Sequence, residues 1–467
     1  MITLYPDQQD LIDRLRLAMR HNKSVLCQSA TGSGKTVMAM HMMQSAAAKG
    51  NAVGFMVPRR KLLDQTSQTL DSLGMAHGFV ASGRSYNPFA KIHMIMTDTI
   101  VRRLEKAPRL KILFDDEAHF GGPEKLKVIR HYQAQGTYVI GLSATPERPN
   151  GDGMGDVYDQ MVKGQTLGWL INNKRLSKYR LFGPDTPDLS AIKTRNGDYA
   201  QKEINSYMMA DEHGKKLVGN AAKHYKENAF GKLNLSFCTS VLSAQMSSQM
   251  FNDAGIPSAC IHGEMDDADI QKIIMAFARR QILNISSCML IAFGFDLSQA
   301  SGIDVTVESM SDLAPSKSRT WQKQKWGRPL RMKPDPALIF DHVGNHLHHG
   351  MPHDEPDWTL EVKDRRKGGG EKTIPVRQCP RCYFVSRPSP ACPACGFVHP
   401  VASRTVEEVE GELAEVTERA RKVAVRREQG RAQTLDDLLA VAARTGKKPG
   451  WARHVFEARQ KKMAAGR

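Results

Sequence analysis

The chain has 467 residues, of which 41% are hydrophobic, so it can bury more than one core, and typical domain sizes suggest about three modules. It has no run of eighteen apolar residues and no signal-peptide pattern at its start, which argues against a membrane-spanning or exported class and predicts a cytoplasmic protein. The net charge is +17, and residues 363–467 hold 23 Lys and Arg against 12 Asp and Glu, a local excess of +11 that favours a nucleic-acid partner over a solvated tail that binds nothing specific.

The first predicted element is a helix that follows residues 4–9 and has apolar residues on one face as far as residue 18. Gln8 lies at its start. The side-chain amide of a glutamine can read both hydrogen-bonding edges of adenine, although one glutamine alone signifies nothing.

Residues 29–36 (SATGSGKT) follow a short apolar strand at 24–28 and precede helix-forming residues 36–48. Strand, glycine-rich loop and helix in this order are what a phosphate-binding loop requires, and a simple Gly/Ser turn is the alternative. The glycines let backbone amides face an anion, the lysine adds charge near the β and γ phosphates, and the threonine offers a hydroxyl to Mg²⁺. The candidate nucleotide-binding residues are Ser29, in place of the usual glycine, Ala30, Thr31, Gly32, Ser33, Gly34, Lys35 and Thr36.

Two further strands are predicted at residues 52–57 and 92–96, and each ends in polar residues. Arg59 and Arg60 follow the first strand, and a helix is predicted from Lys61. Thr97 and Thr99 follow the second strand. Ligands meet parallel sheets at the carboxyl ends of strands, so these side chains are candidates for contacts to nucleic-acid phosphates. A surface charge pair is an equal alternative for the two arginines.

An apolar strand at residues 110–114 delivers the carboxylates Asp115, Asp116 and Glu117. For a hydrolase of Mg-ATP, Asp116 would hold the metal through water, and Glu117 would orient and deprotonate the attacking water. Asp115 receives no catalytic role, and an acidic turn is the alternative. A strand at residues 138–142 then ends in Ser143 and Thr145, whose hydroxyls could sense the γ phosphate.

These motifs, the phosphate loop, Asp-Glu-Ala-His at 116–119 and Ser-Ala-Thr at 143–145, resemble in order and spacing the first motor domain of superfamily 2 helicases of the DEAH-containing type. The resemblance implies that Gln8 reads adenine, as in a Q motif. It also implies nucleic-acid contacts for Arg59 and Thr97, and coupling roles for Ser143 and Thr145.

Residues 163–212 are interpreted as a connector with loops at 183–187 and 194–198. A second β/α series follows, with strands expected near residues 234–238, 258–261, 303–307 and 337–340. Alternating strands and helices imply another parallel sheet with right-handed crossovers.

Two motifs in this second series, at residues 294–296 and 324–331, point to the same nucleotide. An arginine supplied across an interface neutralises charge on a transferring phosphoryl group, and it is worth about 10³ to 10⁵ in rate. The alternative is that Arg328 and Arg331, which are three residues apart, simply lie on the solvated face of a helix. The segment is similar to the helicase C-terminal domain, which implies site roles for its fifth-motif residues Gly294 and Asp296 and for its last-motif residues Gln324, Gly327, Arg328 and Arg331.

Within this superfamily, the chain most resembles the RadD-type bacterial and phage helicases. This resemblance rests on residues 315–318, residues 338–345 and a cysteine module further along the chain. Phe293, Lys325 and Trp326 depart from the common pattern, the last two standing in place of a usually apolar pair.

A polar linker at residues 346–373 contains His346, His348, His349 and His353, which are interpreted as incidental surface histidines rather than a metal site. The next segment is different. Cys379, Cys382, Cys392 and Cys395 form two C-x₂-C knuckles whose spacing predicts a tetrahedral Zn²⁺ site, with disulfides as the alternative. The metal would supply most of this module's folding free energy. The nearby residues Arg377, Arg381, Tyr383, Phe384 and Arg387 suit nucleic-acid contact or, alternatively, packing onto the motor.

The remaining four cysteines, Cys27, Cys238, Cys260 and Cys288, are scattered in apolar runs and are predicted to be buried. Residues 406–431 predict one charged helix that is acidic first and basic last. Residues 435–444, a KKPGWA segment at 447–452 and a helix to residue 462 predict a helical hairpin that resembles the tail of some phage helicases, with Trp451 anchoring it to another surface.

The predicted fold class is α/β, with two tandem RecA-like parallel-sheet domains (1–162 and 213–345), a small zinc ribbon (374–400) and a basic helical tail (401–467). The resemblance implies a monomeric ATP-dependent DNA helicase or translocase that uses ATP, Mg²⁺ and Zn²⁺ in repair, recombination or replication. The alternatives are a duplex-DNA translocase, an RNA helicase, and an ATP-gated clamp. Such a clamp would recruit a repair or replication protein through the zinc module or the tail.

Overall fold

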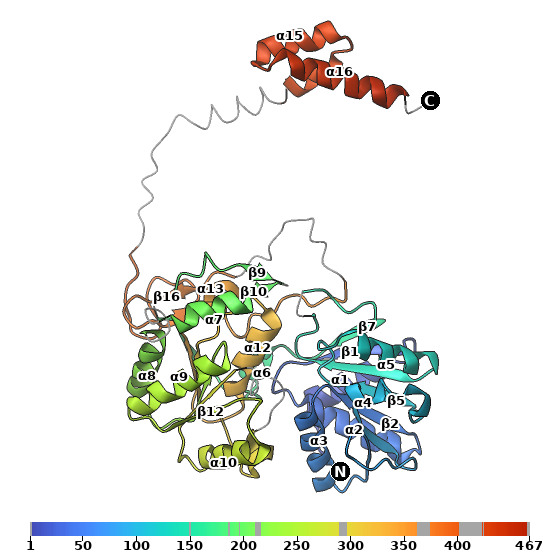
Figure 1. Ribbon diagram of the computed structural model, residues 1–467, viewed down its shortest axis with the longest axis vertical. Coiled ribbons are helices and arrows are strands. Elements are labelled where there is room, and N and C mark those ends of the chain that lie inside the picture. Colours follow the sequence, from blue (N-terminus) through green and yellow to red (C-terminus); the bar gives the residue numbers. More distant parts are fainter. Residues whose placement is uncertain are drawn as a thin grey trace. The chain divides into compact units, whose positions relative to one another are not determined.

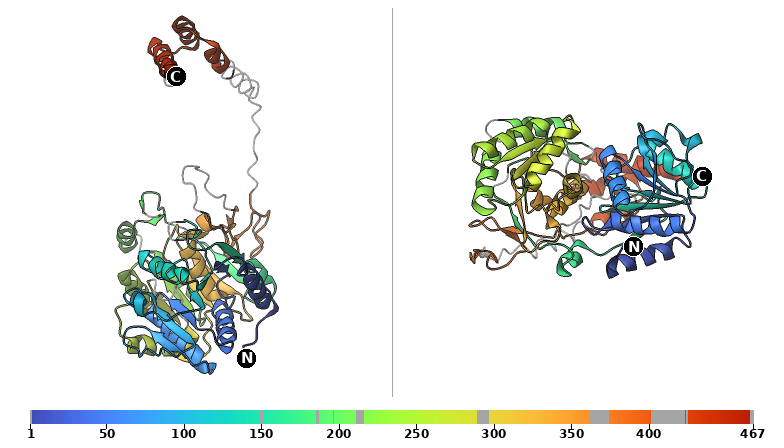
Figure 2. Two further views of the ribbon diagram at one scale, coloured as in Figure 1. Left: turned by 90° about the vertical axis from the view of Figure 1, so that its right-hand side faces the viewer. Right: turned by 90° about the horizontal axis from the view of Figure 1, so that it is seen from below.

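The computed structural model describes residues 2–148, 151–184, 187–195, 197–210, 216–288, 297–361, 374–400, 423 and 425–464. The chain divides into two compact units, Met1–His399 and Pro400–Arg467. The first unit contains two lobes, each built on a parallel sheet, and the lobes lie side by side (Figure 1; Figure 2, right). Along the described part of the chain, no helix is both long and apolar enough to cross a bilayer.

The first lobe is a seven-stranded parallel sheet in the order β3-β4-β2-β5-β6-β1-β7. Its predicted strands are all confirmed to within two residues, whereas β3 and β7 were not predicted. Its elements are α1 (Pro6–Ala18), β1 (Ser24–Gln28), α2 (Lys35–Ala48), β2 (Val53–Val57), α3 (Arg60–Ser72), β3 (Gly78–Val80), β4 (Ile92–Met96), α4 (Thr97–Ile100), η1 (Leu104–Lys106), β5 (Ile112–Asp115), α5 (Pro123–Ala134), β6 (Tyr138–Ser143) and β7 (Gln160–Lys163).

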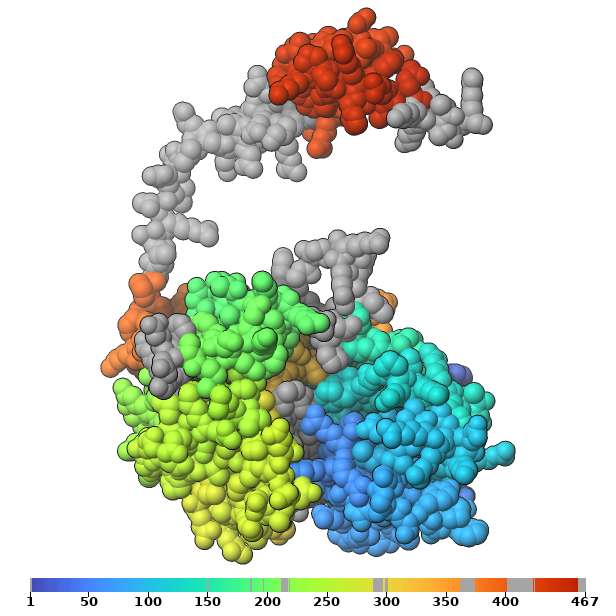
Figure 3. Space-filling view, in the orientation of Figure 1, coloured from blue at the N-terminus to red at the C-terminus, as the bar shows by residue number. Residues whose placement is uncertain are grey.

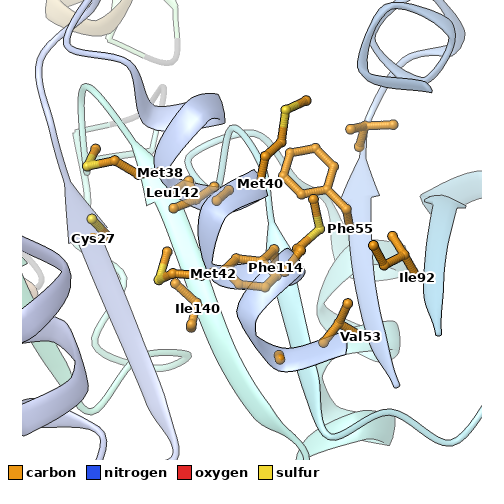
Figure 4. Close-up of a cluster of buried hydrophobic side chains, with 14 of the residues drawn as sticks. Cys27, Met38, Met40, Met42, Val53, Phe55, Ile92, Phe114, Ile140 and Leu142 are labelled. Carbon is orange, nitrogen blue, oxygen red and sulfur yellow. The ribbon is translucent and has the colours of Figure 1, made fainter. Parts of the chain in front are cut away.

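Strands β1, β2 and β4 of this sheet are buried along their whole length, and β5 and β6 are buried after their first residue, as expected for a parallel sheet with both faces covered. Figure 4 shows one packed cluster, where Met38 and Met42 of α2 lie against Phe114 of β5 and Leu142 of β6. Cys27 of β1 belongs to this cluster, so its predicted burial is confirmed. This core fixes the carboxyl ends of β1, β5 and β6, which carry the predicted motifs.

The second lobe is a six-stranded parallel sheet in the order β12-β13-β11-β14-β15-β8. The short helix α6 (Leu167–Asn172) precedes it. Its elements are β8 (Tyr179–Phe182), β9 (Thr194–Arg195), β10 (Asp198–Tyr199), α7 (Gln201–Met209), α8 (Lys216–Asn228), β11 (Asn234–Phe237), α9 (Val241–Asp253), β12 (Ser258–Ile261), α10 (Asp267–Ala278), β13 (Asn284–Ser287), α11 (Leu297–Ser301), β14 (Ser309–Asp312), α12 (Arg319–Gly327), η3 (Arg328–Leu330), β15 (Ala337–Asp341) and α13 (Asn345–His349).

One strand prediction in this lobe is wrong. Residues 303–307 are not a strand, although Val305 and Val307 are buried; the strand is β14, which is polar. The next two strands in the sheet, β11 and then β13, also carry buried polar side chains that bond one another: Asn234 Nδ2 donates to Asn284 Oδ1 at 2.8 Å, and Ser309 Oγ donates to Asn234 Oδ1 at 2.9 Å. The missed strand β13 is therefore a member of a buried polar layer.

The segment predicted as a connector contains part of the second lobe. β8 pairs with β15 at the edge of the sheet, and β9 and β10 form a hairpin where a loop was expected. Gly197 takes φ of 83° at the turn of that hairpin, a value that suits glycine. Of the scattered cysteines here, Cys238 is buried, whereas Cys260 and Cys288 are only half-buried, which corrects the prediction for those two.

The prediction of surface histidines is wrong for two of the four. His346 and His349 lie on α13 and are buried. His346 Nδ1 and the Asp341 carboxylate are 2.7 Å apart, and His349 Nε2 lies 2.7 Å from the Ser316 carbonyl. These histidines hold α13 against the ends of β14 and β15.

The second unit contains a helical hairpin, α15 (Leu435–Thr445) and α16 (Pro449–Ala464), as predicted. Thr434 caps α15 by accepting a hydrogen bond from the Asp437 amide at 3.2 Å, and Gly446 ends the helix at φ of 70°. Trp451 is half-buried and packs against the small core of this hairpin, and its predicted role as an anchor to another surface stays a prediction. The charged helix predicted at 406–431 falls almost entirely outside the described residues.

Candidate nucleotide site between the two lobes

The phosphate loop joins β1 to α2 with the backbone that its glycines favour. Gly32 and Gly34 have φ of 82° and 90°, which residues with a Cβ rarely adopt. The Ser29 and Ser33 hydroxyl oxygens lie 2.6 Å apart, so serine at the first position joins the two ends of the loop. Lys35 Nζ donates to the Ser29 carbonyl at 3.1 Å. The loop therefore places a lysine at a helix N-terminus, where anions are stabilised.

Gln8 contacts this loop directly. Its Nε2 donates to the Ser33 carbonyl at 2.8 Å, and its Oε1 accepts from the Tyr5 amide at 3.0 Å. A Cβ at Gly34 would lie 2.4 Å from Gln8 Nε2, so a larger residue there would displace the Gln8 amide, and the φ of 90° also favours glycine. In this structure, Gln8 braces the loop.

The carboxylates at the end of β5 have different surroundings. Asp115 is buried, pairs with Lys125 Nζ at 2.6 Å and accepts from the Tyr158 hydroxyl at 2.8 Å, so it is a structural residue, in line with the absence of a predicted catalytic role. Asp116 and Glu117 face the open cleft instead. Burial and the neighbouring Glu117 raise the pKa of Asp116 to about 7. Two adjacent carboxylates that repel each other in this way suit a divalent cation.

The backbone at Glu117 is strained. Its φ of 47° is left-handed, which is uncommon for a residue other than glycine and costs about 1–3 kcal/mol. With this backbone conformation the Glu117 side chain points into the cleft. The residues on either side stay bound to the sheet, because the amides of Asp116 and Ala118 donate to carbonyls of neighbouring strands.

A cleft of about 460 Å³ brings the predicted residues of both lobes together. Figure 3 shows the two lobes meeting along a seam. Burial lowers the pKa of Lys35, and the charges of Glu117 and Asp116 oppose that shift, so the three groups act on one another inside this cleft. From the predicted site, the cleft is lined by Thr31, Gly32, Gly34, Lys35, Thr36, Asp116 and Glu117 of the first lobe and by Gln324, Gly327, Arg328 and Arg331 of the second. The candidate residues Gly294 and Asp296 lie outside the described residues.

The lobes touch at the phosphate loop. A Cβ at Gly327 would lie 2.6 Å from Thr31 Cγ2, so the glycine of the last motif allows α12 to approach the loop. A Cβ at Gly32 would lie 2.9 Å from Leu176 Cδ2, and the next residue, Ser177, donates from its amide to the Leu330 carbonyl at 2.9 Å. The short stretch before β8 thus bridges the phosphate loop and the arginine motif.

A second contact between the lobes passes through His119. Its Nδ1 lies 2.9 Å from Ser143 Oγ, and its Nε2 lies 3.0 Å from Gln324 Nε2. Burial lowers the pKa of His119 to about 4, so the ring is neutral at pH 7 and can both donate and accept. Sequence reasoning assigned Ser143 and Gln324 separate roles and gave His119 none; only folding joins the three.

The opposite wall of the cleft is the face of α3. Leu62, Gln65, Thr66 and Thr69 line it, and no motif pointed to them. These residues are three and four positions apart, so they share one face of a helix. From the sequence this spacing predicted a helix but no binding role.

The residues predicted to contact nucleic acid are not among those that line the nucleotide cleft. Arg59 is exposed, and Arg60 donates to the Ser82 carbonyl at 2.6 Å. Thr97 is buried and donates to the Val57 carbonyl at 3.3 Å, so its hydroxyl hydrogen is used inside the lobe. Thr97 also lines a hollow of about 400 Å³ together with Phe120.

The four clustered cysteines form a site that fits zinc. Their sulfur atoms all lie within 4.8 Å of one another, and the Cys379–Cys395 and Cys382–Cys392 sulfur pairs are each 3.7 Å apart. A tetrahedron with Zn–S bonds of about 2.3 Å has edges of about 3.8 Å. A disulfide needs about 2.05 Å, so none of these pairs is bonded.

The cysteine module, which contains β16 (Arg377–Gln378) and β17 (Val385–Ser386), packs on the motor. The Gly183 amide donates to the Tyr383 carbonyl at 2.9 Å, directly after β8. The rings of Phe384 and Phe182 meet edge to face with centroids 5.8 Å apart, and Val385 is buried in the second-lobe core. These contacts favour packing onto the motor, the alternative to nucleic-acid contact, for the two aromatic residues.

Comparison with known proteins agrees with this geometry. Residues 1–148 match the family model described as type III restriction enzyme, res subunit. The 51.5 kDa protein of a Lactococcus phage (isolate 7-9) is 30% identical over 359 residues, which cover 76% of this chain and 74% of that protein.

Two solved structures have a similar fold. One is the ATP-dependent type ISP restriction-modification enzyme LlaBIII bound to DNA, with a TM-score of 0.54 and 15% identity over 73% of this chain. The other is a fragment described as an HsdR subunit of a type I restriction enzyme from Vibrio vulnificus YJ016, with a TM-score of 0.55 and 17% identity over 76% of this chain. The chain spans 28% of the first and 66% of the second. This chain belongs to the family of the Lactococcus phage 51.5 kDa protein, and its two lobes have a fold similar to that of the two restriction enzymes.

Proposed function

We propose that this protein hydrolyses ATP between its two lobes and uses the resulting closure and release to move on DNA or to separate its strands. One observation carries the proposal: Lys35, Glu117 and the arginines Arg328 and Arg331 line a single cleft although the two pairs come from different lobes. The match of residues 1–148 to the family model described as type III restriction enzyme, res subunit, supports the choice of DNA.

Each residue of the cleft has a task in this proposal. When bound, Mg-ATP supplies the phosphoryl group and the charge that polarises it. Lys35 and the loop amides bind the phosphates, and Thr36 and Asp116 hold Mg²⁺. Glu117 orients the attacking water and accepts its proton. Arg328 and Arg331 neutralise the charge that develops on the transferring group. Gly294 and Asp296 are proposed to contribute from the fifth motif.

The His119 contacts provide a route for coupling. His119 follows Glu117 by two residues and lies between Ser143 of the first lobe and Gln324 of the second. A change in the distance between the lobes therefore moves the group beside the catalytic carboxylate. Thr145 belongs to the same unit, because its amide donates to Ser143 Oγ at 3.1 Å.

Further parts of the proposal rest on resemblance and charge. The RadD-like and DEAH-type assignments, a monomeric state and a role in repair, recombination or replication are proposed from the sequence motifs. The proposed domains are two motor domains at residues 1–162 and 213–345, a segment at 163–212 that connects them and adds β8 to the second sheet, a linker at 346–373, a zinc module at 374–400 and a basic tail at 401–467. The zinc module or the tail would receive a protein partner, and the basic excess would bind phosphates.

The test is ATP hydrolysis titrated with single-stranded DNA, duplex, forked DNA and RNA, with strand separation measured in parallel. We expect DNA to stimulate hydrolysis more than RNA does, with an effect that weakens steeply as salt is raised. Stimulation by duplex without strand separation favours a translocase, and stimulation by RNA alone favours an RNA helicase. Nucleotide-dependent DNA binding without hydrolysis favours the clamp. Lys35→Ala is the control for contaminating ATPase, and hydrolysis that survives this change contradicts the proposal.

A further inference from the structure

A second hollow, of about 500 Å³, lies away from the nucleotide cleft and has aromatic walls. Phe120 comes from the loop after β5, Tyr199 from the β9–β10 hairpin and Trp321 from the first turn of α12. All three side chains are half-buried, so each presents part of its ring to the hollow. Arg195 of the same hairpin is exposed and also lines it. We refer to this hollow as the aromatic pocket.

The hairpin that carries Tyr199 is held in place by the second lobe. Asp198 accepts hydrogen bonds from the Lys317 amide at 2.6 Å and from Ser316 Oγ at 2.7 Å. Lys317 Nζ lies 4.7 Å from the centre of the Tyr199 ring, a cation–π contact. Gln201 Nε2 donates to the Thr239 carbonyl at 2.7 Å just beyond the hairpin. The pocket therefore has a wall that is ordered before any ligand arrives, which lowers the entropy cost of binding.

The aromatic pocket adjoins the surface predicted to bind nucleic acid. Phe120 lines the aromatic pocket and also the hollow that contains Thr97 and Asp98. Phe120 thus lines two hollows: one is formed by the first lobe, and the aromatic pocket lies where Phe120 meets the second lobe. A strand whose backbone contacts the first-lobe hollow would pass Phe120 and reach the aromatic pocket.

Two residues that line the pocket, Phe120 and Trp321, are close in the sequence to His119 and Gln324, which form the contact between the lobes. Phe120 follows His119, and their ring centroids are 4.3 Å apart. Trp321 precedes Gln324 by one helical turn, and the His119 and Gln324 nitrogens are 3.0 Å apart. A flat group that stacks on Trp321 next to Phe120 would therefore touch the chain neighbours of both residues in the contact that joins the lobes.

We propose that the aromatic pocket binds an unpaired nucleobase of a single-stranded nucleic acid, stacked on Tyr199 and Trp321 next to Phe120. The inference rests on the proposed function and adds the chemical form of the substrate: a base must be unpaired to enter. Stacking does not depend on the base, because every base has a π face, and Arg195 and Lys317 supply positive charge for the adjoining phosphates. This binding would favour the closed arrangement of the lobes and so stimulate hydrolysis.

The test compares two strands on two proteins. The strands are a single-stranded DNA oligonucleotide and its abasic counterpart, which keeps the sugar–phosphate backbone, and the proteins are wild type and Tyr199→Ala. We expect wild type to bind the normal strand about tenfold more tightly than the abasic strand, and Tyr199→Ala to bind both with similar affinity. Tyr199→Phe keeps the ring and should restore the preference. Phe230→Ala, which removes an exposed ring outside the pocket, should leave the preference unchanged.

Three outcomes separate the inference from the proposed function. Wild-type protein that hydrolyses ATP with DNA stimulation but binds both strands equally overturns the pocket and leaves the motor intact. Tyr199→Ala that weakens both strands by the same factor also overturns it. Wild-type protein that neither binds DNA nor hydrolyses ATP contradicts the proposed function itself. RNA oligonucleotides in the same design identify which sugar the strand carries, and 2-aminopurine fluorescence on wild type alone reports stacking if the variant does not fold.

Discussion

At the scale of single residues, the site depends on a few positions where one atom decides the geometry. Glu117 takes a left-handed backbone to reach the cleft, and Gly327 has no side chain because Thr31 occupies that space. Neither the backbone conformation of Glu117 nor the missing side chain of Gly327 takes part in phosphoryl transfer. Both determine whether the catalytic side chains of the two lobes can reach the same phosphate.

Gly327→Ala tests the approach of the lobes. The new Cβ would lie 2.6 Å from Thr31 Cγ2, so the α12 end must move away from the phosphate loop. A displacement of about 1 Å costs about 10²-fold in rate, and we expect that loss in DNA-stimulated ATPase with little change in melting temperature. Gly263→Ala is a matched control, because a Cβ there meets nothing within 4 Å. Full activity of Gly327→Ala would mean that this contact does not matter for turnover.

His119 gives a prediction on acid stability. Its pKa is lowered by burial to about 4, against about 6.5 in an unfolded chain. Between those values the unfolded chain binds the proton and the folded protein does not, so the stability falls as the pH drops from 6.5 to 4. His342 and His349, whose pKa values burial lowers to about 3, act in the same direction. Melting temperature measured against pH should show the decline, and His119→Asn should flatten it; an unchanged slope would contradict the buried, neutral histidine.

At the scale of elements, α12 is anchored by an ion pair that no motif predicted. Lys325 is fully buried, and its Nζ lies 2.6 Å from Asp312 Oδ1 and donates to the Ala314 carbonyl at 2.7 Å. Lysine thus stands in a usually apolar position because β14 ends in a buried carboxylate. The helix that carries the arginines is fixed to the sheet through this pair.

Lys325→Met should show how much that anchor contributes. Removing the cation leaves the Asp312 carboxylate buried without its charge partner, which costs about 3–5 kcal/mol. We expect a clear drop in the melting temperature of the second lobe, recorded by circular dichroism or calorimetry. Lys178→Met, an exposed lysine before β8, is the control and should melt like wild type. Equal melting temperatures for the two variants would exclude a stabilising role for the pair.

The cysteine module gives a prediction on metal. Cys392→Ser should release zinc and loosen the contact of Phe384 and Val385 with the second lobe, because the module has little core besides the metal. Metal analysis should find about one zinc per chain in wild type and in Cys260→Ser, and none in Cys392→Ser. Purified wild-type protein without zinc would exclude the site.

The elements also show what could be predicted from sequence. Five strands of the first lobe, β1, β2, β4, β5 and β6, were predictable because they are mostly apolar, and the phosphate loop because its glycines have a local backbone purpose. β13 and β14 were not, because their asparagines and serines are buried through hydrogen bonds to one another, such as Asn234 to Asn284. His346 is buried for a similar reason, since its partner Asp341 lies on a strand. Such pairings depend on tertiary neighbours.

At the scale of the whole molecule, the nucleotide cleft, the His119 contact and the aromatic pocket lie along one interface between the lobes. The sequence motifs predicted a part of the residues that line the cleft, from both lobes. They could not predict that α3 also lines it or that a hairpin from the connector lines the aromatic pocket, because each surface combines segments with no common motif. A motor that closes on ATP would move all three features together.

The central claim is that residues of both lobes hydrolyse one ATP, and the most direct measurement is DNA-stimulated hydrolysis by Glu117→Gln and Arg328→Ala. We predict losses of about 10²-fold or more for the first and about 10³-fold for the second, with binding of a fluorescent ATP analogue retained in Glu117→Gln. Glu105→Gln and Arg279→Ala, which change exposed residues outside the cleft, should match wild type. Undiminished hydrolysis by either Glu117→Gln or Arg328→Ala would contradict the account.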